Sequence, residues 1–244
     1  MCGIAAIVAF DGNRADRSRV SRMLDLQRHR GPDDAGILDA GQVVLGFRRL
    51  SIIDLSPMGH QPMTSGDGRA HLVFNGEIYN YRELREQLRQ PWPEESYSGA
   101  NYPRGYPFAS ASDSEVVLAS YQRWGPECLN RFNGMWAIVI WDEARRRVFL
   151  ARDRFGVKPL VMKMEGSTLA VASEPKALVR SAQRSPAPNL EAVSEFLYHG
   201  VSHFGPSSFF EDVTYLEAGC YMCIDLDEPR LTPQRFWSLG QKET

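Results

Sequence analysis

Residues 1–10, MCGIAAIVAF, decide the fold, because they join a buried strand to a cysteine in an unusual place. The run from residue 2 to residue 10 is continuously apolar, which is typical of a strand that is buried on both faces. Cys2 begins this run and directly follows Met1. Two interpretations are open from these residues alone. Either Cys2 is a small side chain in a packed core, or it is a nucleophile that becomes N-terminal when Met1 is removed.

A cysteine at the N-terminus of a processed chain has a general base within the same residue. The pKa of a free α-amino group is about 7.7–8, and that of a thiol is about 8.5. The neutral amine therefore takes the thiol proton, directly or through a water molecule, and later returns it to a leaving group. Such a site needs no separate histidine and aspartate. It does require removal of Met1 and the absence of an attached N-terminal leader.

Composition places the chain among ordinary globular proteins. Of its 244 residues, 43% are hydrophobic and 24% are charged, and this length is ample for a buried core. The formal net charge of -2 creates no field that would attract nucleic acid or an anionic membrane. The sequence contains no apolar run of membrane-spanning length and no secretory leader. We therefore expect a cytoplasmic protein with reduced thiols and with neither nucleic acid nor membrane as a partner.

Cys220 and Cys223 have the CxxC spacing of metal and redox sites, but their context favours a plain strand. They lie in GCYMCIDL, residues 219–226, where residues three apart point to opposite faces of a strand. No second pair of Cys or His residues stands near them in the sequence. The glycine clusters also lack the spacing of phosphate-binding loops. We expect no metal site and no cofactor in this chain.

Strand-like and helix-like runs alternate along most of the chain. Strands are expected over residues 2–10, 42–54, 71–78, 134–142, 146–153, 159–165 and 168–174, and helices over 16–29, 79–89, 112–125, 174–182 and 189–200. Ser112 is the expected N-cap of its helix, with Asp113 and Glu115 in the first turn. Two groups of strands with helices on both sides indicate two packed sheets between helical layers.

Residues 90–111, QPWPEESYSGANYPRGYPFASA, interrupt this pattern. The segment is rich in Pro, Gly, Ser and Tyr, so we expect a surface loop or a partly disordered stretch.

Eight blocks of sequence, in order, resemble the glutaminase domain of asparagine synthetases and related class II glutamine amidotransferases. They are MCGI (1–4), RHRGPDDAG (28–36), RRLSIIDLSPMGHQPM (48–63), FNGEIYNY (74–81), SDSEVVL (112–118), FNGMWAIVIWD (132–142), ARDRFGVKPL (151–160) and SEPKAL (173–178). The resemblance runs from residue 2 to about residue 237 and is interrupted mainly at Gln90–Gly105. It implies an α+β fold, the four-layer αββα sandwich of the N-terminal-nucleophile (Ntn) hydrolases, in agreement with the layers predicted above.

The resemblance implies a catalytic role for three residues. Cys2 corresponds to the nucleophile that attacks the carboxamide of glutamine and forms a γ-glutamyl thioester. Asn75, through its side-chain amide, and Gly76, through its main-chain N–H, correspond to the oxyanion hole. Gly76 also has no side chain to obstruct the substrate. The alternative for the Asn-Gly pair is a simple hairpin turn.

Three further residues correspond to those that hold the amino-acid head group of glutamine. Arg49 suits the α-carboxylate, because a guanidinium binds a carboxylate with two parallel hydrogen bonds. Glu77 and Asp113 suit the α-ammonium group. The alternatives are a surface salt bridge for Arg49 and a plain helix cap for Asp113. His29, His60 and Asp153 fall within the blocks, but we expect them to hold loops in place.

Asparagine synthetases continue into an ATP-dependent synthetase domain that has an SGG-x-DS loop, and these 244 residues contain no such loop. We therefore expect an amidotransferase domain over residues 2–237 and a tail or linker over 238–244. The expected partners are L-glutamine and a synthetase domain or subunit that receives ammonia. ATP and magnesium are expected only there. A homodimer, other ammonia acceptors and a catalytically silent docking module stay open as alternatives. Residues 90–105 are expected to be a solvated insertion without a task, with a lid or a docking loop as alternatives.

Overall fold

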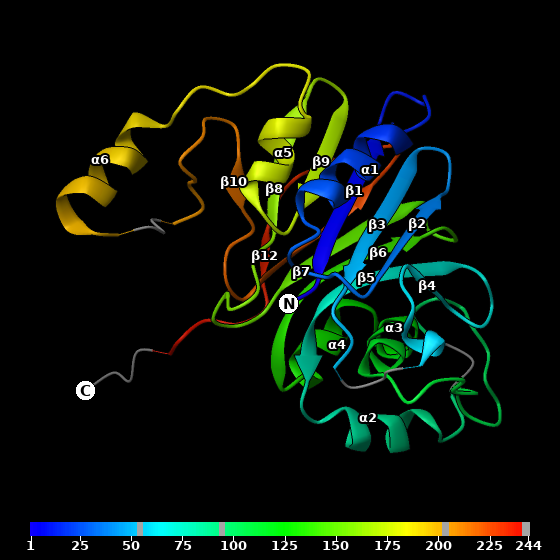
Figure 1. The fold of residues 1–244 in the computed structure, drawn as a ribbon. Helices are drawn as coiled ribbons and strands as arrows, with labels where there is room; N and C mark the ends of the chain where they lie inside the picture. The colour runs from blue at the N-terminus through cyan, green and yellow to red at the C-terminus, as the bar shows by residue number, and fades with distance from the viewer. Residues whose placement is uncertain (53–55, 93–95, 202–204, 241–244) are drawn as a thin grey trace.

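Two six-stranded antiparallel sheets form the centre of the molecule in the computed structural model, which describes residues 1–52, 56–92, 96–201 and 205–240 (Figure 1). The first sheet has the order β10-β8-β9-β1-β3-β2, and the second has the order β12-β11-β7-β6-β5-β4. The strands of the first sheet are β1 Gly3–Ala9, β2 Asp34–Asp39, β3 Val43–Arg49, β8 Val161–Glu165, β9 Thr168–Ala172 and β10 Thr214–Tyr215. Those of the second are β4 Met63–Thr64, β5 Ala70–Ile78, β6 Gly134–Asp142, β7 Arg147–Arg152, β11 Cys220–Asp225 and β12 Gln234–Arg235.

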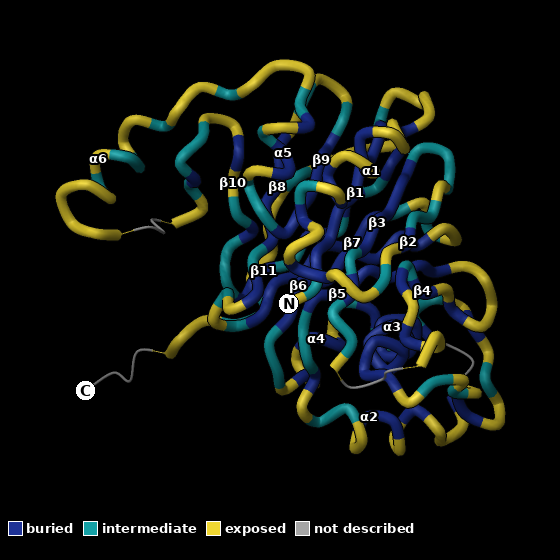
Figure 2. Tube along the Cα trace, in the orientation of Figure 1, coloured by how far each residue is buried: buried dark blue, intermediate teal, exposed yellow. Residues whose placement is uncertain are grey.

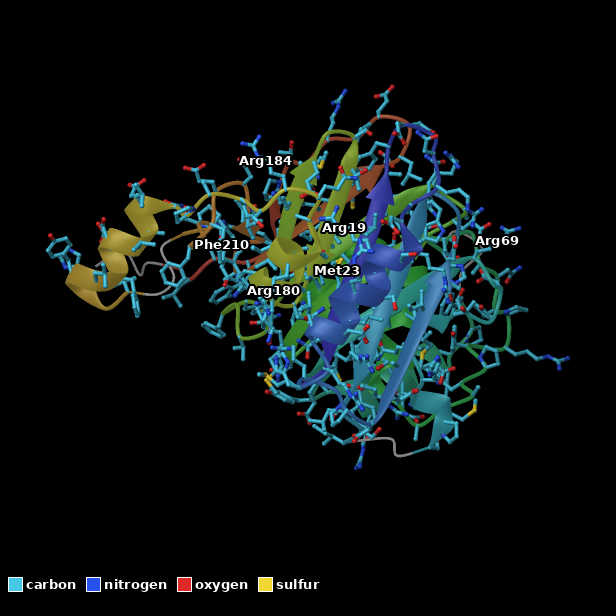
Figure 3. The ribbon with its side chains drawn as sticks, turned by 45° about the horizontal axis from the view of Figure 1, so that its top comes forward. Arg19, Met23, Arg69, Arg180, Arg184 and Phe210 are labelled. Carbon is cyan, nitrogen blue, oxygen red and sulfur yellow. The ribbon has the colours of Figure 1, made fainter. Side chains whose placement is uncertain are left out.

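Helices cover the outer face of each sheet, which confirms the predicted αββα layers. The helices α1 (Arg17–Leu26) and α5 (Pro175–Ser181) pack on the first sheet, where Met23 of α1 is buried (Figure 3). On the second sheet, α3 (Asp113–Trp124) packs against β5, with α2 (Tyr81–Leu88) and α4 (Cys128–Arg131) beside it. The predicted N-cap is confirmed, because the Ser112 hydroxyl accepts a hydrogen bond from Ser114 N at 3.0 Å.

The strand that opens the sequence lies in the middle of the first sheet and is buried along its whole length. Ile4, Ala6 and Val8 point into the core between the sheets, whereas Ala5 and Ile7 point into the core beneath α1 and α5. The continuous apolar run therefore serves two cores at once, as predicted for a strand buried on both faces.

Several element boundaries differ from the predictions. The strand predicted over residues 42–54 ends at Arg49, because the main chain then turns away and Ser51 N donates to the Asp33 carboxylate at 2.8 Å. Residues 53 and 54 of that prediction lie outside the described residues. The strands β2, β4, β10 and β12 had no counterpart among the predicted ranges, and three of them are only two residues long.

Residues 90–111 form a loop, as predicted, but several of their side chains are buried, which contradicts the prediction of a solvated insertion at residues 90–105. The described part contains no helix or strand, but Trp92, Ala100 and Tyr106 are buried in the core cluster beneath α2 and α3. The polar composition of the segment concealed this, because its aromatic side chains follow neither a helical nor a strand period. Residues 93–95 lie outside the described part.

The CxxC pair behaves as predicted for a strand. Cys220 packs between the sheets, whereas Cys223 packs toward the cluster beneath the second helical layer. The described residues contain no group of side chains arranged to hold a metal ion. They also contain no helix of the length and apolarity that a bilayer span needs. Helix α6 (Leu190–His199) lies away from both sheets and has no buried residue (Figures 1 and 2).

Candidate active site

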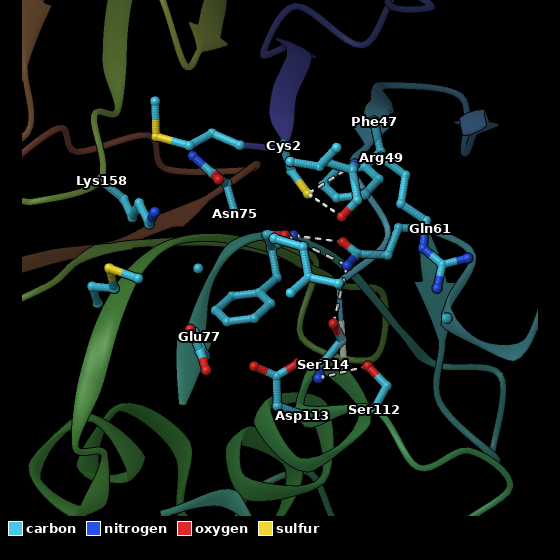
Figure 4. A pocket seen from close by; sticks show the side chains of 17 residues that line it. Cys2, Phe47, Arg49, Gln61, Asn75, Glu77, Ser112, Asp113, Ser114 and Lys158 are labelled. Carbon is cyan, nitrogen blue, oxygen red and sulfur yellow. Dashed lines mark hydrogen bonds between the residues drawn. The ribbon is translucent and has the colours of Figure 1, made fainter. Parts of the chain in front are cut away.

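One cleft gathers all six residues that the sequence singled out for chemistry or binding (Figure 4). Its cavity volume is about 130 Å³. Its walls come from the start of β1, the end of β3, the end of β5 and the first turn of α3. The residues concerned are Cys2, Arg49, Asn75, Gly76, Glu77 and Asp113.

Cys2 lines the cleft and is held through both its side chain and its main chain. Its sulfur lies 3.4 Å from Leu50 N, and its carbonyl oxygen accepts a hydrogen bond from Arg30 Nε at 2.8 Å. Arg30 is itself fixed by Glu174, at 2.9 Å. Burial raises the pKa of the Cys2 thiol, and the Leu50 N–H, the N-terminal charge, Arg49 and Arg30 oppose that rise. The thiol is therefore protonated at neutral pH and needs a base before it can act as a nucleophile.

Asn75 and Gly76 lie within β5, so the hairpin-turn alternative is wrong. They pair with Ala137 and Trp136 of β6. The side-chain Nδ2 of Asn75 is buried and has no hydrogen-bond partner in the described part of the chain. Gly76 is required by the sheet, because a Cβ there would lie 2.3 Å from Met135 O.

Arg49 ends β3 and is buried, so it is not on the surface. Its Nη1 donates to the carbonyl oxygen of Ser56 at 2.9 Å. Gly59 makes room for the guanidinium, since a Cβ at residue 59 would lie 2.1 Å from Arg49 Nη2. The turn at residues 56–59 therefore holds the guanidinium in place at the wall of the cleft.

Asp113 begins α3, and Glu77 lies near the end of β5. The Asp113 carboxylate accepts a hydrogen bond from Ile78 N at 3.0 Å. Burial raises its pKa to about 6, the charge of Glu77 adds to the rise, and main-chain N–H groups oppose it. Because Ser112 caps the helix, Asp113 is not a plain helix cap. The cleft thus carries positive charge at Arg49 and negative charge at Glu77 and Asp113, which suits a zwitterionic amino acid.

Three residues of the site were missed by the motif analysis. Gln61 lines the cleft, and its side chain joins β5 to α3: Oε1 accepts from Phe74 N at 2.7 Å, and Nε2 donates to Ser114 Oγ at 3.1 Å. Lys158 is buried and lines the cleft beside Asn75 (Figure 4). Arg30 is the third residue, because it holds the main chain of Cys2 through the hydrogen bond described above. All three stand inside the quoted blocks, and Lys158 is one of only four lysines in the sequence.

The two histidines hold loops, as predicted, and neither is among the residues that line the cleft. His29 Nε2 lies 2.9 Å from Glu174 Oε1, and His60 Nδ1 lies 2.6 Å from Asp34 Oδ2. Asp153 is also structural, as predicted, since its carboxylate accepts hydrogen bonds from four main-chain N–H groups.

Comparisons with known proteins agree with this geometry. The family model of a glutamine amidotransferase domain matches residues 1–237. A putative asparagine synthetase [glutamine-hydrolyzing] of Mycobacterium tuberculosis is 38% identical over 250 residues, which cover 93% of this chain and 36% of that protein. A second one, from Methanocaldococcus jannaschii, is 33% identical over 258 residues, which cover 98% of this chain and 47% of that protein. The chain thus spans less than half the length of these curated relatives.

Among solved structures, the chain is similar to the glutamine phosphoribosylpyrophosphate amidotransferase of Bacillus subtilis in complex with ADP and GMP. The TM-score is 0.65 at 21% sequence identity, over 97% of this chain and 49% of that one. At this identity the match shows the fold alone, and it confirms the predicted Ntn sandwich.

Proposed function

Because the chain belongs to the glutamine amidotransferase domain family, we propose that it hydrolyses L-glutamine to L-glutamate and ammonia through a γ-glutamyl thioester on Cys2. The observation that carries this proposal is the content of the cleft. A thiol, a buried amide donor without a partner among the described residues, and charges of both signs meet there from four separate elements.

The head group of glutamine is proposed to bind between the two sets of charges. Arg49 takes the α-carboxylate, and Glu77 and Asp113 take the α-ammonium group. This places the carboxamide of the substrate toward Cys2. Proximity and orientation of this kind supply a large part of the rate enhancement in enzymes.

Removal of Met1 would free the α-amino group of Cys2, which then acts as the base. The amine takes the thiol proton while the sulfur attacks the carboxamide carbon, forming a C–S bond and an oxyanion. Asn75 Nδ2 and Gly76 N donate hydrogen bonds to that oxyanion. The C–N bond then breaks, the ammonium group of Cys2 returns the proton to the leaving nitrogen, and ammonia departs. Water attacks the thioester by the same route and releases glutamate.

We further propose that the ammonia serves an amidation reaction of the asparagine synthetase type, on a synthetase domain or subunit. The support is the activity for which these relatives are named, and this chain matches less than half of their length. ATP and magnesium would act on that synthetase part, and the chemistry at Cys2 needs no cofactor.

The second candidate, a catalytically silent docking module, differs from the first in whether Met1 is removed. A chain that keeps Met1 has no free amine on Cys2, so the proposed base would be missing.

The test is the mass of the intact chain and of its N-terminal peptide after incubation with 6-diazo-5-oxo-norleucine, a reactive analogue of glutamine. We expect loss of Met1 and one adduct, located on Cys2. Cys2→Ala should show no adduct and no glutamate release, whereas Cys223→Ala serves as the matched control and should keep both. An unlabelled Cys2 in a folded, processed chain, or glutamate release by Cys2→Ala, would contradict the proposal.

A further inference from the structure

The segment that precedes α3 is packed by a chain of aromatic rings. We call residues 96–111 the aromatic strap. The ring centroids of Trp92 and Tyr102 lie 4.7 Å apart, those of Tyr102 and Tyr106 lie 5.0 Å apart, and those of Tyr106 and Phe108 lie 4.8 Å apart. The strap is also tied to the end of α2, because Tyr106 N donates to Leu88 O at 2.9 Å. Trp92, which lies before the strap and contacts its rings, donates through Nε1 to the same oxygen at 2.9 Å.

Two buried charged residues hold the last residues of the strap. The carboxylate of Glu115 accepts hydrogen bonds from Ala109 N at 2.9 Å, and from Ser110 N and Ser110 Oγ at 2.7 Å each. The guanidinium of Arg85 donates to Ser110 O at 2.7 Å and to Ser112 O at 2.9 Å. Both the N–H and the carbonyl groups of the strap end are therefore held.

Burial of these two charged side chains is energetically unfavourable, which indicates that they are kept for the position in which they hold the end of the strap. Arg85 is 9% exposed and Glu115 is 7% exposed. Taking a guanidinium and a carboxylate out of water costs several kcal/mol for each ion, and apolar side chains of similar volume would often be at least as stable. The Arg85 guanidinium also lies 4.2 Å from the ring centroid of Phe108, so the strap itself shields the charges.

The held segment ends directly before Asp113. Ser112 is the N-cap of α3, and Asp113 is the first helical residue and points into the cleft (Figure 4). Neither Arg85 nor Glu115 is among the residues that line the cleft. Any influence they have on a ligand must therefore pass through the position of the strap end and of Asp113.

We propose that Arg85 and Glu115 are positioning residues that join the aromatic strap to the first turn of α3 and thereby determine recognition of the α-ammonium group of the substrate by Asp113. The proposal rests on the proposed function. The strap would then support the substrate site without lining it, whereas the sequence predicted an insertion without a task at residues 90–105.

The test compares two substrates that differ only in the α-ammonium group: L-glutamine and 4-carbamoylbutanoate, which lacks it. For the full chain we expect Glu115→Gln and Arg85→Met to lower kcat/KM for glutamine about tenfold, within the range for a misplaced charged hydrogen bond. The value for 4-carbamoylbutanoate should change less than about twofold, because that substrate makes no use of Asp113. Ser110→Ala, which removes one of the three bonds to Glu115, should give a smaller change in the same direction.

Matched controls come from the surface of α2. Arg89 and Glu86 form an exposed ion pair at 2.7 Å on the same helix as Arg85. Arg89→Met and Glu86→Gln remove the same charges and should leave the ratio of the two kcat/KM values unchanged. If Glu115→Gln and Arg85→Met leave the ratio of the two kcat/KM values unchanged, this inference is wrong. The proposed hydrolysis of glutamine would not be affected by that result.

A binding measurement separates this inference from the proposed function. The same variants are titrated with L-glutamate and with glutarate, which again differ only in the α-ammonium group. If the unaltered chain hydrolyses nothing and Cys2 is not labelled, the proposed function is wrong. The inference then stands if the unaltered chain prefers glutamate and the two variants lose that preference, and it fails if they keep it or if the unaltered chain has none.

Discussion

The turn at residues 152–158 and the first turn of α3 each bury one aspartate. They differ in how far main-chain hydrogen bonds compensate the burial of its carboxylate. Asp153 is 1% exposed, and its two oxygens accept from four main-chain N–H groups at 2.9–3.1 Å, those of Trp136, Phe155, Val157 and Lys158. Asp113 is 5% exposed, but its main-chain bonds do not offset its burial, and its pKa rises to about 6. A buried carboxylate that faces a cleft, and whose burial is not compensated by hydrogen bonds within the protein, is available to a cationic ligand.

The two buried amides of the cleft repeat this contrast. The amide of Gln61 uses both ends, with Phe74 N at 2.7 Å and Ser114 Oγ at 3.1 Å. That of Asn75 leaves Nδ2 without a partner in the described part of the chain. A missing partner alone does not mark a functional group, because the indole nitrogens of Trp136 and Trp141 also lack one. Among the described side chains with such an atom, Asn75 is the one that also lines the cleft. Its location in the cleft and its lack of a partner together identify the Asn75 amide as a candidate functional group.

The largest expected effect tests the structural side of the comparison. Asp153→Ala leaves four main-chain N–H groups without their acceptor, of which those of Trp136 and Lys158 are buried, at about 1–3 kcal/mol for each group that finds no water. We expect the free energy of unfolding to fall by about 4 kcal/mol or more, measured by urea denaturation. Asp227→Ala, which removes an exposed aspartate paired with Arg146, is the control and should change it by less than about 1 kcal/mol. A small loss in Asp153→Ala would remove the contrast between the two aspartates.

The second largest expected effect concerns Asn75, whose buried amide nitrogen is proposed to serve catalysis and not stability. Asn75→Ala should lower kcat for glutamine hydrolysis by about 10²–10³, as for the loss of one oxyanion donor. The free energy of unfolding should stay within about 1 kcal/mol, since the lost Nδ2 makes no hydrogen bond in the described structure. Glutamate release and urea denaturation measure the two quantities. Asn130→Ala, an exposed control, should alter neither, and a destabilised but active Asn75→Ala chain would reverse the assignment.

Local patterns in the sequence predicted most of the fold. The apolar run at residues 2–10, the alternating strands and the Ser112 cap all depend on neighbouring residues, and the structure contains them. The strap could not be predicted in this way, because its order comes from pairs such as Arg85 with Ser110 and Glu115 with Ala109, which no periodicity reveals. Strands of only two residues could not be predicted either, since they are too short to show an alternation of apolar and polar residues.

For the site, residue chemistry and resemblance contributed different parts. Residue chemistry alone left Cys2 open between core packing and catalysis, and only the family resemblance connected it with Arg49, Asn75 and Asp113. The structure places these residues in one cleft, although they come from four elements. Gln61 and Lys158 were missed because their importance lies in which groups they face, and a motif does not show that.

The smallest expected effect concerns the stability contributed by Asp113 itself and its dependence on pH. Its pKa is about 6 in the folded chain against an ordinary value of 3.8. Between these values the folded state binds more protons than the unfolded state, so this carboxyl lowers stability progressively as pH rises from about 4 to about 6 and fully above that. Asp113→Asn lacks this penalty and keeps an acceptor for Ile78 N. We therefore expect it to raise the free energy of unfolding at pH 7.5 by an amount on the order of 1–3 kcal/mol, with the gain shrinking toward pH 4.

The same variant should bind glutamine poorly, so its gain in stability would accompany a loss of function. Urea denaturation at a series of pH values, beside glutamine titrations, measures both. Asp227→Asn is the matched control of opposite sign, because Arg146 lowers the pKa of that exposed carboxyl and no gain above pH 6 is expected from its removal. A gain in Asp113→Asn that did not vary with pH would have to come from packing. Asp113 would then resemble Asp153, a carboxylate that the fold itself satisfies, and the contrast between the two turns would not hold.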